Sequence, residues 1–114
     1  MTSQQPIQDR ERSDILETLS KHRGFLLQTV QGVSDADAAE RTTVSELCLG
    51  GLIKHVSSAE QGWATFIVDG PARSGPPDEA AYATHAASFR MEPGETLAAL
   101  VAEYQEIAAR TDEL

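Results

Sequence analysis

The stretch TVSELCLGGLIKHVSSAEQGWATFIVDG, residues 43–70, carries the strongest structural signal in the chain. Its apolar residues recur every three or four positions, which is the spacing of one face of an α-helix. The sequence therefore predicts a helix over residues 43–69. The side chains expected to point inward are Leu49, Leu52, Ile53, Val56, Ala59, Glu60, Trp63, Phe66 and Ile67.

Local signals mark both ends of this helix. Thr43 and Glu46 have the spacing of a capping box, in which a hydroxyl and a carboxylate satisfy free backbone amides, and Ser45 is the alternative cap. Gly70 and Pro71 end the helix, because proline cannot continue it.

Two glycines, Gly50 and Gly51, lie inside the predicted helix. Each costs about 1 kcal/mol relative to alanine in a helix interior. We therefore expect either that another helix approaches closely at this point or that the glycines serve a function.

Two further long helices are predicted. The first covers about residues 8–31, with Gly32 as its C-terminal cap and with Ile15, Leu19, Phe25, Leu26 and Val30 at helical spacing. The other covers residues 93–114, because Pro93 suits the first position of a helix. Its expected inward face is Leu97, Leu100, Val101, Tyr104, Ala108 and Leu114.

The connections between these helices differ in length. Residues 34–42, SDADAAERT, form a short connector with room for a helical turn. Residues 71–92 form a long loop, in which a short helix can cover about residues 78–87. A helix–helix connection this long is usually functional or mobile. The organisation predicted is a flexible tail, residues 1–8, and one helical domain, residues 9–114.

The fold class predicted is all-α, an antiparallel helical bundle, because no stretch shows the alternation of a β-strand. Three amphipathic helices with wide apolar faces usually need a fourth to complete their core. Either the fold is a three-helix bundle, or another chain covers the remaining apolar surface.

Composition excludes several classes of protein. Apolar residues make up 40% of the 114, which is too many for a disordered chain. Lys and Arg number 9 against 18 Asp and Glu, so a net charge of -9 disfavours nucleic acid. No apolar run is long enough for a membrane span, and the polar start MTSQQPIQDRER predicts a cytoplasmic location.

Three histidines are candidates for chemistry. His55 lies in the middle of the predicted second long helix, where a side chain near a bundle core can bind a divalent metal. The alternative is a boundary histidine with one hydrogen bond. His22 falls on the inner face of the first helix and His85 in the long loop, where a boundary role and exposure to solvent are expected.

The single cysteine, Cys48, excludes an internal disulfide and a four-cysteine zinc site. A position near a helix N-terminus can make a thiol reactive, whereas the simpler interpretation is a small buried residue. Trp63, Phe66 and Tyr104 can line a pocket, although aromatic residues at helical spacing more often belong to a core.

Residues 43–70 also resemble the DinB-like superfamily, most closely its DUF664 branch. The resemblance is carried by Leu52, Lys54, His55, Glu60 and Trp63 in the order typical of that group. The flanking segments ILETLSKHRGFLLQTVQGVSDADAAERTTV and FRMEPGETLAALVAEYQEIAARTDEL are similar to it as well, so the resemblance extends from about Asp9 onward.

The resemblance implies a four-helix bundle that holds a divalent metal, often zinc or nickel, with three histidines. His55 matches the ligand on the second helix. The other two ligands come from a His-x-x-x-His pair on a fourth helix, and this sequence is expected to end before that helix. Relatives include mycothiol-dependent maleylpyruvate isomerase and bacillithiol transferases, in which the metal binds and activates a low-molecular-weight thiol.

Two hypotheses follow. The first is a DinB-like metal-dependent thiol S-transferase or isomerase, incomplete in this chain, with His55 as a metal ligand and with Glu60 and Trp63 lining the pocket or orienting a ligand. Its substrates would be a small thiol and an electrophile. The alternative is a non-catalytic helical module that forms a homodimer through an uncovered apolar face, Leu97, Leu100, Val101 and Tyr104.

Overall fold

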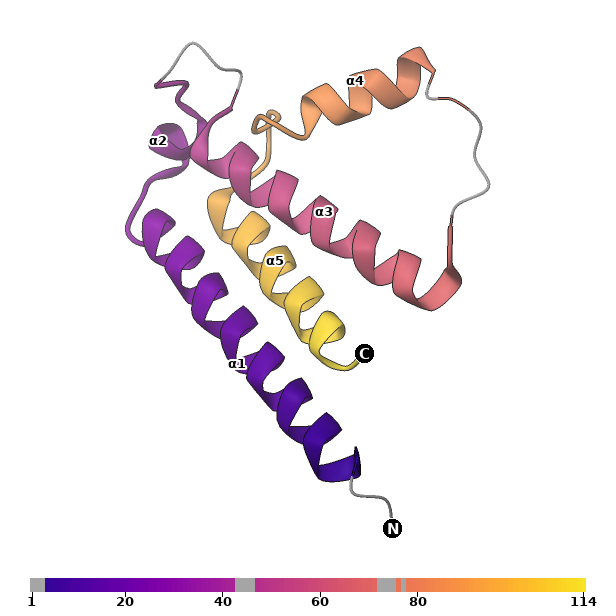
Figure 1. The fold of residues 1–114 in the computed structure, drawn as a ribbon. Helices are drawn as coiled ribbons and strands as arrows, with labels where there is room; N and C mark the ends of the chain where they lie inside the picture. The colour runs from indigo at the N-terminus through magenta and orange to yellow at the C-terminus, as the bar shows by residue number, and fades with distance from the viewer. Residues whose placement is uncertain (1–3, 43–46, 72–75, 77) are drawn as a thin grey trace. The chain divides into compact units, whose positions relative to one another are not determined.

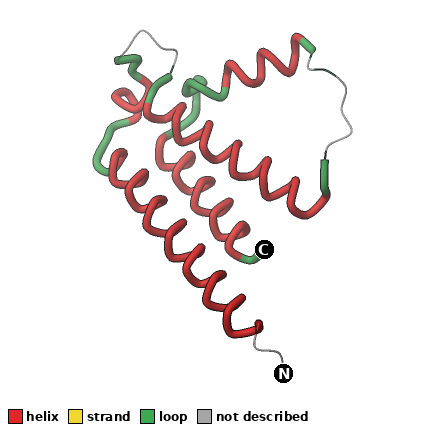
Figure 2. Tube along the Cα trace, viewed as in Figure 1, coloured by secondary structure: helices red, strands yellow, loops and turns green. Residues whose placement is uncertain are grey.

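The computed structural model describes residues 4–42, 47–71, 76 and 78–114. Within these residues the regular secondary structure is entirely helical, with five helices and no strand (Figures 1 and 2). The all-α class is therefore confirmed. The chain divides into two compact units, Met1–Gln31 and Gly32–Leu114.

The first unit is a single helix, α1, which covers Gln4–Val30. It begins four residues before the predicted start, inside the segment expected to be a tail. Pro6 is compatible with this start, because the first four amides of a helix have no partner within it. The helix ends near the predicted position, where Gly32 has a φ of 76°.

The second unit begins with a short helix, α2, Asp35–Ala39, in the predicted connector. Ser34 caps it, since its hydroxyl accepts a hydrogen bond from the Asp37 amide at 3.1 Å. The Asp35 carboxylate accepts a second bond, from the Leu97 amide at 2.8 Å. This contact joins the start of α2 to the start of the last helix.

The central helix, α3, covers Leu49–Asp69 and begins six residues after the predicted start. Cys48 is its N-terminal cap, and its sulfur accepts a hydrogen bond from the Gly51 amide at 3.3 Å. The expected caps Thr43, Ser45 and Glu46 lie outside the described residues. At the other end, Gly70 has a φ of 76°, as expected for a glycine that ends a helix.

The long connection contains a helix, α4, which covers Glu79–Ala87 with Asp78 as its cap. The last helix, α5, covers Leu97–Asp112 and is capped by Thr96. It was expected to begin at Pro93. Pro93 lies instead in a turn, because Gly94 adopts a φ of 89° that interrupts any helix.

The main packing contact of the second unit joins α3 to α5, which lie side by side (Figure 1). Lys54 contacts Glu95 near the start of both helices, and Glu60 contacts Thr111 near the end of α5. The two helices therefore run parallel to each other, so the predicted antiparallel arrangement is wrong for this pair. Helices joined by short connections in a bundle are antiparallel. The long connection containing α4 carries the chain back to allow this.

The buried face of α3 is narrower than the sequence suggested. Ile53 is fully buried, and Gly50, Gly51 and Ser57 are buried with it. Toward the end of α3, the expected inward residues Trp63, Phe66 and Ile67 are exposed by 67%, 47% and 66%. Their spacing predicts one continuous apolar face along the helix. The residues of α3 that are buried in the structure lie in its first half instead.

The buried residues of α5 agree with the predicted inward face better than those of α3 do. Leu97, Leu100, Tyr104, Ile107 and Ala108 are buried. The face that was expected to be uncovered is therefore largely covered, and Leu114, expected to point inward, is exposed by 46%. The exposed large apolar side chains of the unit lie mainly on the second half of α3 instead.

Candidate functional site

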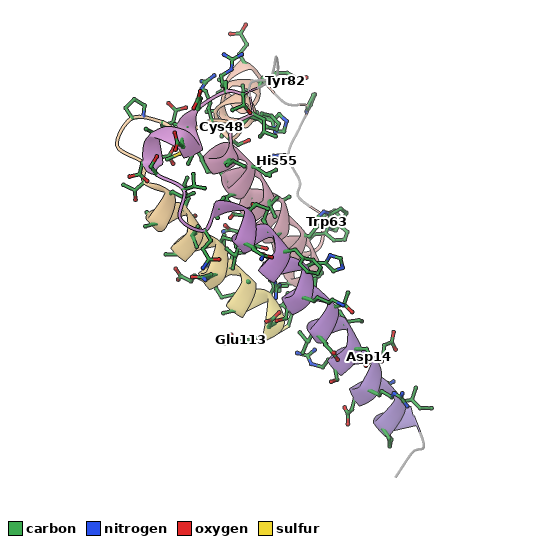
Figure 3. All side chains as sticks on the ribbon, turned by 90° about the vertical axis from the view of Figure 1, so that its left-hand side faces the viewer. Asp14, Cys48, His55, Trp63, Tyr82 and Glu113 are labelled. Carbon is green, nitrogen blue, oxygen red and sulfur yellow. The ribbon has the colours of Figure 1, made fainter. Side chains whose placement is uncertain are left out.

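His55 lies in the first half of α3, between Cys48 and Trp63 along the helix (Figure 3). Its side chain is half-buried, and its ring stacks on Phe89 with centroids 4.7 Å apart and an interplanar angle of 29°. The ring of His85, near the end of α4, is the second neighbour at 6.1 Å and 72°. His85 also meets Phe89 edge to face at 5.0 Å. The three rings form one cluster between α3 and the end of the long connection.

The two glycines of α3 allow this cluster to form. A Cβ added to Gly51 would collide with the backbone carbonyl of Phe89, and one added to Gly50 would collide with the side chain of Met91. The chain therefore crosses α3 at backbone contact distance. Of the two interpretations of the glycine pair, a close approach is the correct one, but the approaching segment is a turn, residues 89–91, and not a helix. The approach places Phe89 one helical turn from His55.

Cys48 supports the same crossing. Its thiol is buried, it accepts from the Gly51 amide, and it lies 3.9 Å from the carbonyl oxygen of Phe89. Its backbone amide donates to that carbonyl at 3.4 Å. Of the two interpretations given above, burial and these contacts favour a structural cysteine.

Lys54, the neighbour of His55, ties α3 to the long connection. Its ammonium group donates to the carbonyls of Ala87 at 3.3 Å and Arg90 at 3.1 Å, and to the carboxylate of Glu95 at 2.9 Å. Burial raises the pKa of Glu95, but a hydrogen bond from the Glu92 amide and the bond and charge of Lys54 outweigh it. The net effect is a lowered pKa, so Glu95 is ionised near neutral pH.

A cavity of about 320 Å³ opens beside Lys54, between α3, α4 and α5. Small-molecule sites in proteins begin at about this volume. The cavity is rich in polar groups, which include two carboxylates, an ammonium group, an amide and several hydroxyls. They come from Lys54, Ser57, Ser58 and Gln61 of α3, from Thr84 and Ser88 of the connection, and from Glu95 and Glu103.

The other two predicted site residues lie farther along α3. The carboxylate of Glu60 accepts a hydrogen bond from the Thr111 hydroxyl at 3.0 Å, so it contacts α5. Trp63 is exposed and contacts Phe66 edge to face at 5.8 Å. In the structure, neither side chain belongs to the ring cluster around His55.

The remaining histidine, His22, lies on α1 in the other unit and contacts Phe25 with ring centroids 5.7 Å apart. Across the described part of the chain, no group of three His, Cys, Asp or Glu side chains gathers in a way that could hold a metal. The described residues therefore do not supply by themselves the three-ligand set that the resemblance implies. None of the described helices is long and apolar enough to cross a membrane.

Sequence reasoning missed the proximity of His85 to His55 and the contacts of Lys54. The glycine pair was the available signal, since a close approach to this helix was one of its two interpretations. The segment that makes this approach, residues 89–91, has no pattern of its own in the sequence.

The model of one protein family, described as mycothiol-S-transferase, matches residues 14–114. The match includes α2 to α5 and most of α1. No curated protein and no solved structure is significantly similar to the chain.

Proposed function

The chain thus belongs to the mycothiol-S-transferase family, and we propose that it transfers a low-molecular-weight thiol of the mycothiol type to a small electrophile. The observation that carries this proposal is the family match across nearly the whole chain. An isomerisation assisted by the same thiol is the neighbouring reaction that the DinB-like resemblance suggests.

The cavity beside Lys54 supports a small polar ligand. Its volume fits a small molecule, and its hydroxyl, amide and carboxylate groups suit a ligand that carries many hydrogen-bond donors. Lys54 holds the wall of this cavity in place, because its three hydrogen bonds join α3 to residues 87, 90 and 95.

His55 is proposed as a ligand of a divalent metal, zinc or nickel. Imidazole suits both metals, and the half-buried ring on α3 is held in place by Phe89. A bound metal of this kind would favour the thiolate form of a thiol. Because the described residues gather no group of three ligands, we assign no step of the reaction to the metal.

Glu60 and Trp63 are proposed to line the path of the substrate along the second half of α3. The exposed indole of Trp63 offers an apolar surface to an electrophile. Glu60 would have a positioning role and hold α3 against α5, because its carboxylate accepts a hydrogen bond from Thr111 of α5.

Loss of free thiol provides the test of the proposed function. Purified chain with added zinc, mycothiol and a chromophoric aryl halide should consume the thiol faster than the same mixture without protein. A second thiol, glutathione, should react more slowly with the same protein. No acceleration over the protein-free mixture would overturn the proposal.

A second candidate, a self-associating helical module, is favoured by one observation. Trp63, Phe66 and Ile67 are exposed on one face of α3, and contiguous apolar surface usually marks an interface. Sedimentation should then show a homodimer that Ile67→Glu converts to monomer, whereas Gln61→Glu, also exposed on α3, should leave it intact. A monomeric wild-type chain would contradict this candidate.

A further inference from the structure

We propose that the cavity beside Lys54 binds the ammonium group of a small organic amine, and that the Glu103 carboxylate selects this group. Glu103 lies on α5 and lines the cavity together with residues of α3 and α4. In the thiol transfer, the amine would be the electrophilic substrate, and that part of the inference rests on the proposed function. The binding of the amine itself does not.

The ammonium group of Lys54 has no donor left for an anionic ligand. An ammonium group carries three N–H donors. In Lys54 they are directed to the carbonyls of Ala87 and Arg90 and to the carboxylate of Glu95. The charge of Lys54 is also matched, because the Glu95 carboxylate oxygen lies 2.9 Å away. A ligand carboxylate or phosphate would therefore have to displace one of these partners.

Glu103 leaves the cavity with an excess of negative charge. The charged groups of the lining are the Lys54 ammonium group and the carboxylates of Glu95 and Glu103, which sum to one net negative charge. In the described part of the chain, the Glu103 carboxylate takes part in no hydrogen bond or ion pair. A cation is thus the ligand that this carboxylate attracts, and the net charge of -9 on the whole chain adds to the attraction.

The rest of the lining suits the organic part of an amine. Leu100 and Ile107 are buried and give the cavity an apolar wall. Ser58 and Gln61 are exposed on α3 and add a hydroxyl and an amide oxygen, which with Glu103 can accept hydrogen bonds from an ammonium group. A volume of about 320 Å³ admits a small molecule with a short apolar body.

NMR titration of the full chain at neutral pH with benzylamine, benzyl alcohol and benzoate tests the binding. The three probes share a ring and differ in charge. Benzylamine should bind at least about tenfold more tightly than the other two, because hydrogen bonds between charged groups are the strong ones. It should also shift the amide resonances of Ser57, Ser58 and Gln61, which line the cavity.

A pair of variants on α5 locates the selecting charge. Glu103→Gln should weaken benzylamine binding by at least about tenfold, because it replaces the carboxylate by a neutral amide. Glu106→Gln removes the same charge from an exposed position of α5 outside the cavity lining, so it is the matched control and should leave the affinity unchanged.

Rates with two electrophiles test whether the amine is the substrate. In the wild type, a chromophoric aryl halide that carries an aminomethyl group should have a higher kcat/KM than its hydroxymethyl counterpart. The ratio of the two values should fall toward one in Glu103→Gln and should be kept in Glu106→Gln.

The outcomes separate this inference from the proposed function. Equal affinity for the three probes, or equal loss of benzylamine affinity in Glu103→Gln and Glu106→Gln, would overturn the amine site, while thiol transfer to a neutral electrophile would still support the proposed function. Selective benzylamine binding without any thiol transfer would contradict the proposed function and leave the amine site standing. Binding that depends on Glu103 without a preference in rate would overturn the amine as substrate.

Discussion

The Lys54 ammonium group and the Glu95 carboxylate lie 2.9 Å apart, and this ion pair joins α3 to the segment that leads into α5. The same ammonium group donates to the carbonyls of Ala87 and Arg90. One side chain therefore fixes the end of α4 and the turn after it against α3. Phe89, which stacks on His55, lies between Ala87 and Arg90, so the contacts of Lys54 also hold the Phe89 ring near His55.

Removal of the Lys54 ammonium group should destabilise the chain. In Lys54→Met, the Glu95 carboxylate and two carbonyls lose their donor, so we expect the free energy of unfolding to fall by about 1–3 kcal/mol in urea. The control is Glu92→Gln, which removes an exposed ion pair with Arg90 at 3.4 Å and should change stability by less than about 1 kcal/mol. Equal losses in both variants would contradict the attachment role of Lys54.

The lowered pKa of Glu95 predicts a pH dependence. A depressed carboxyl pKa stabilises the folded state above the ordinary value of 4.5, and this stabilisation is lost as the pH falls through the lower, folded value. The difference in unfolding free energy between wild type and Glu95→Gln should therefore be larger at pH 7 than at about pH 3. Urea titrations at both pH values measure it, and a difference independent of pH would exclude the ion pair as its source.

The crossing at Gly51 predicts opposite effects for two glycine substitutions in the same helix. Gly51→Ala forces a Cβ into the backbone of Phe89 and should cost about 1–3 kcal/mol of stability. Gly62→Ala meets nothing within 4 Å and should stabilise the chain by about 0.5–1 kcal/mol through helix propensity. Thermal or urea unfolding measures the stability of both variants relative to the wild type. A harmless Gly51→Ala would mean that residues 89–91 do not cross α3 as described.

Cys48 is expected to act as a cap and not as a nucleophile. Cys48→Ala removes the acceptor for the Gly51 amide and should lower the unfolding free energy by about 1 kcal/mol. Cys48→Ser keeps an acceptor at that point and should restore the stability. Thiol-transfer rates of the folded Cys48→Ser variant should equal those of the wild type, whereas a large loss would give the thiol a chemical role.

The helical class and the approximate place of every helix could be predicted from the sequence, because periodicity and glycine breaks are local signals. The starts of α3 and α5 could not. At α3 the cap is a cysteine sulfur, which is a rare capping group. At α5 a turn at Gly94 follows Pro93, where the sequence predicts the start of the helix. In both cases a nearby residue, the capping Cys48 or the turn-forming Gly94, determines where the helix begins.

The candidate site was predictable only in part. His55 could be singled out by its place on the helix and by the family resemblance, and Gly50–Gly51 left a close approach of another helix as one of two interpretations. The partners of His55 could not be found, because His85 and Phe89 lie 30 and 34 residues farther along the chain in a connection with poor periodicity. The parallel course of α3 and α5 likewise depends on that connection and not on either helix.

The central claim is that this chain transfers a thiol at a site that includes His55. The most direct measurement is the initial rate of mycothiol consumption with zinc and a small electrophile, compared between His55→Ala and His22→Ala. The account predicts that His22→Ala keeps the wild-type rate, while His55→Ala loses at least about 100-fold, as expected when a residue central to the chemistry is removed. Equal rates in the two variants would contradict it.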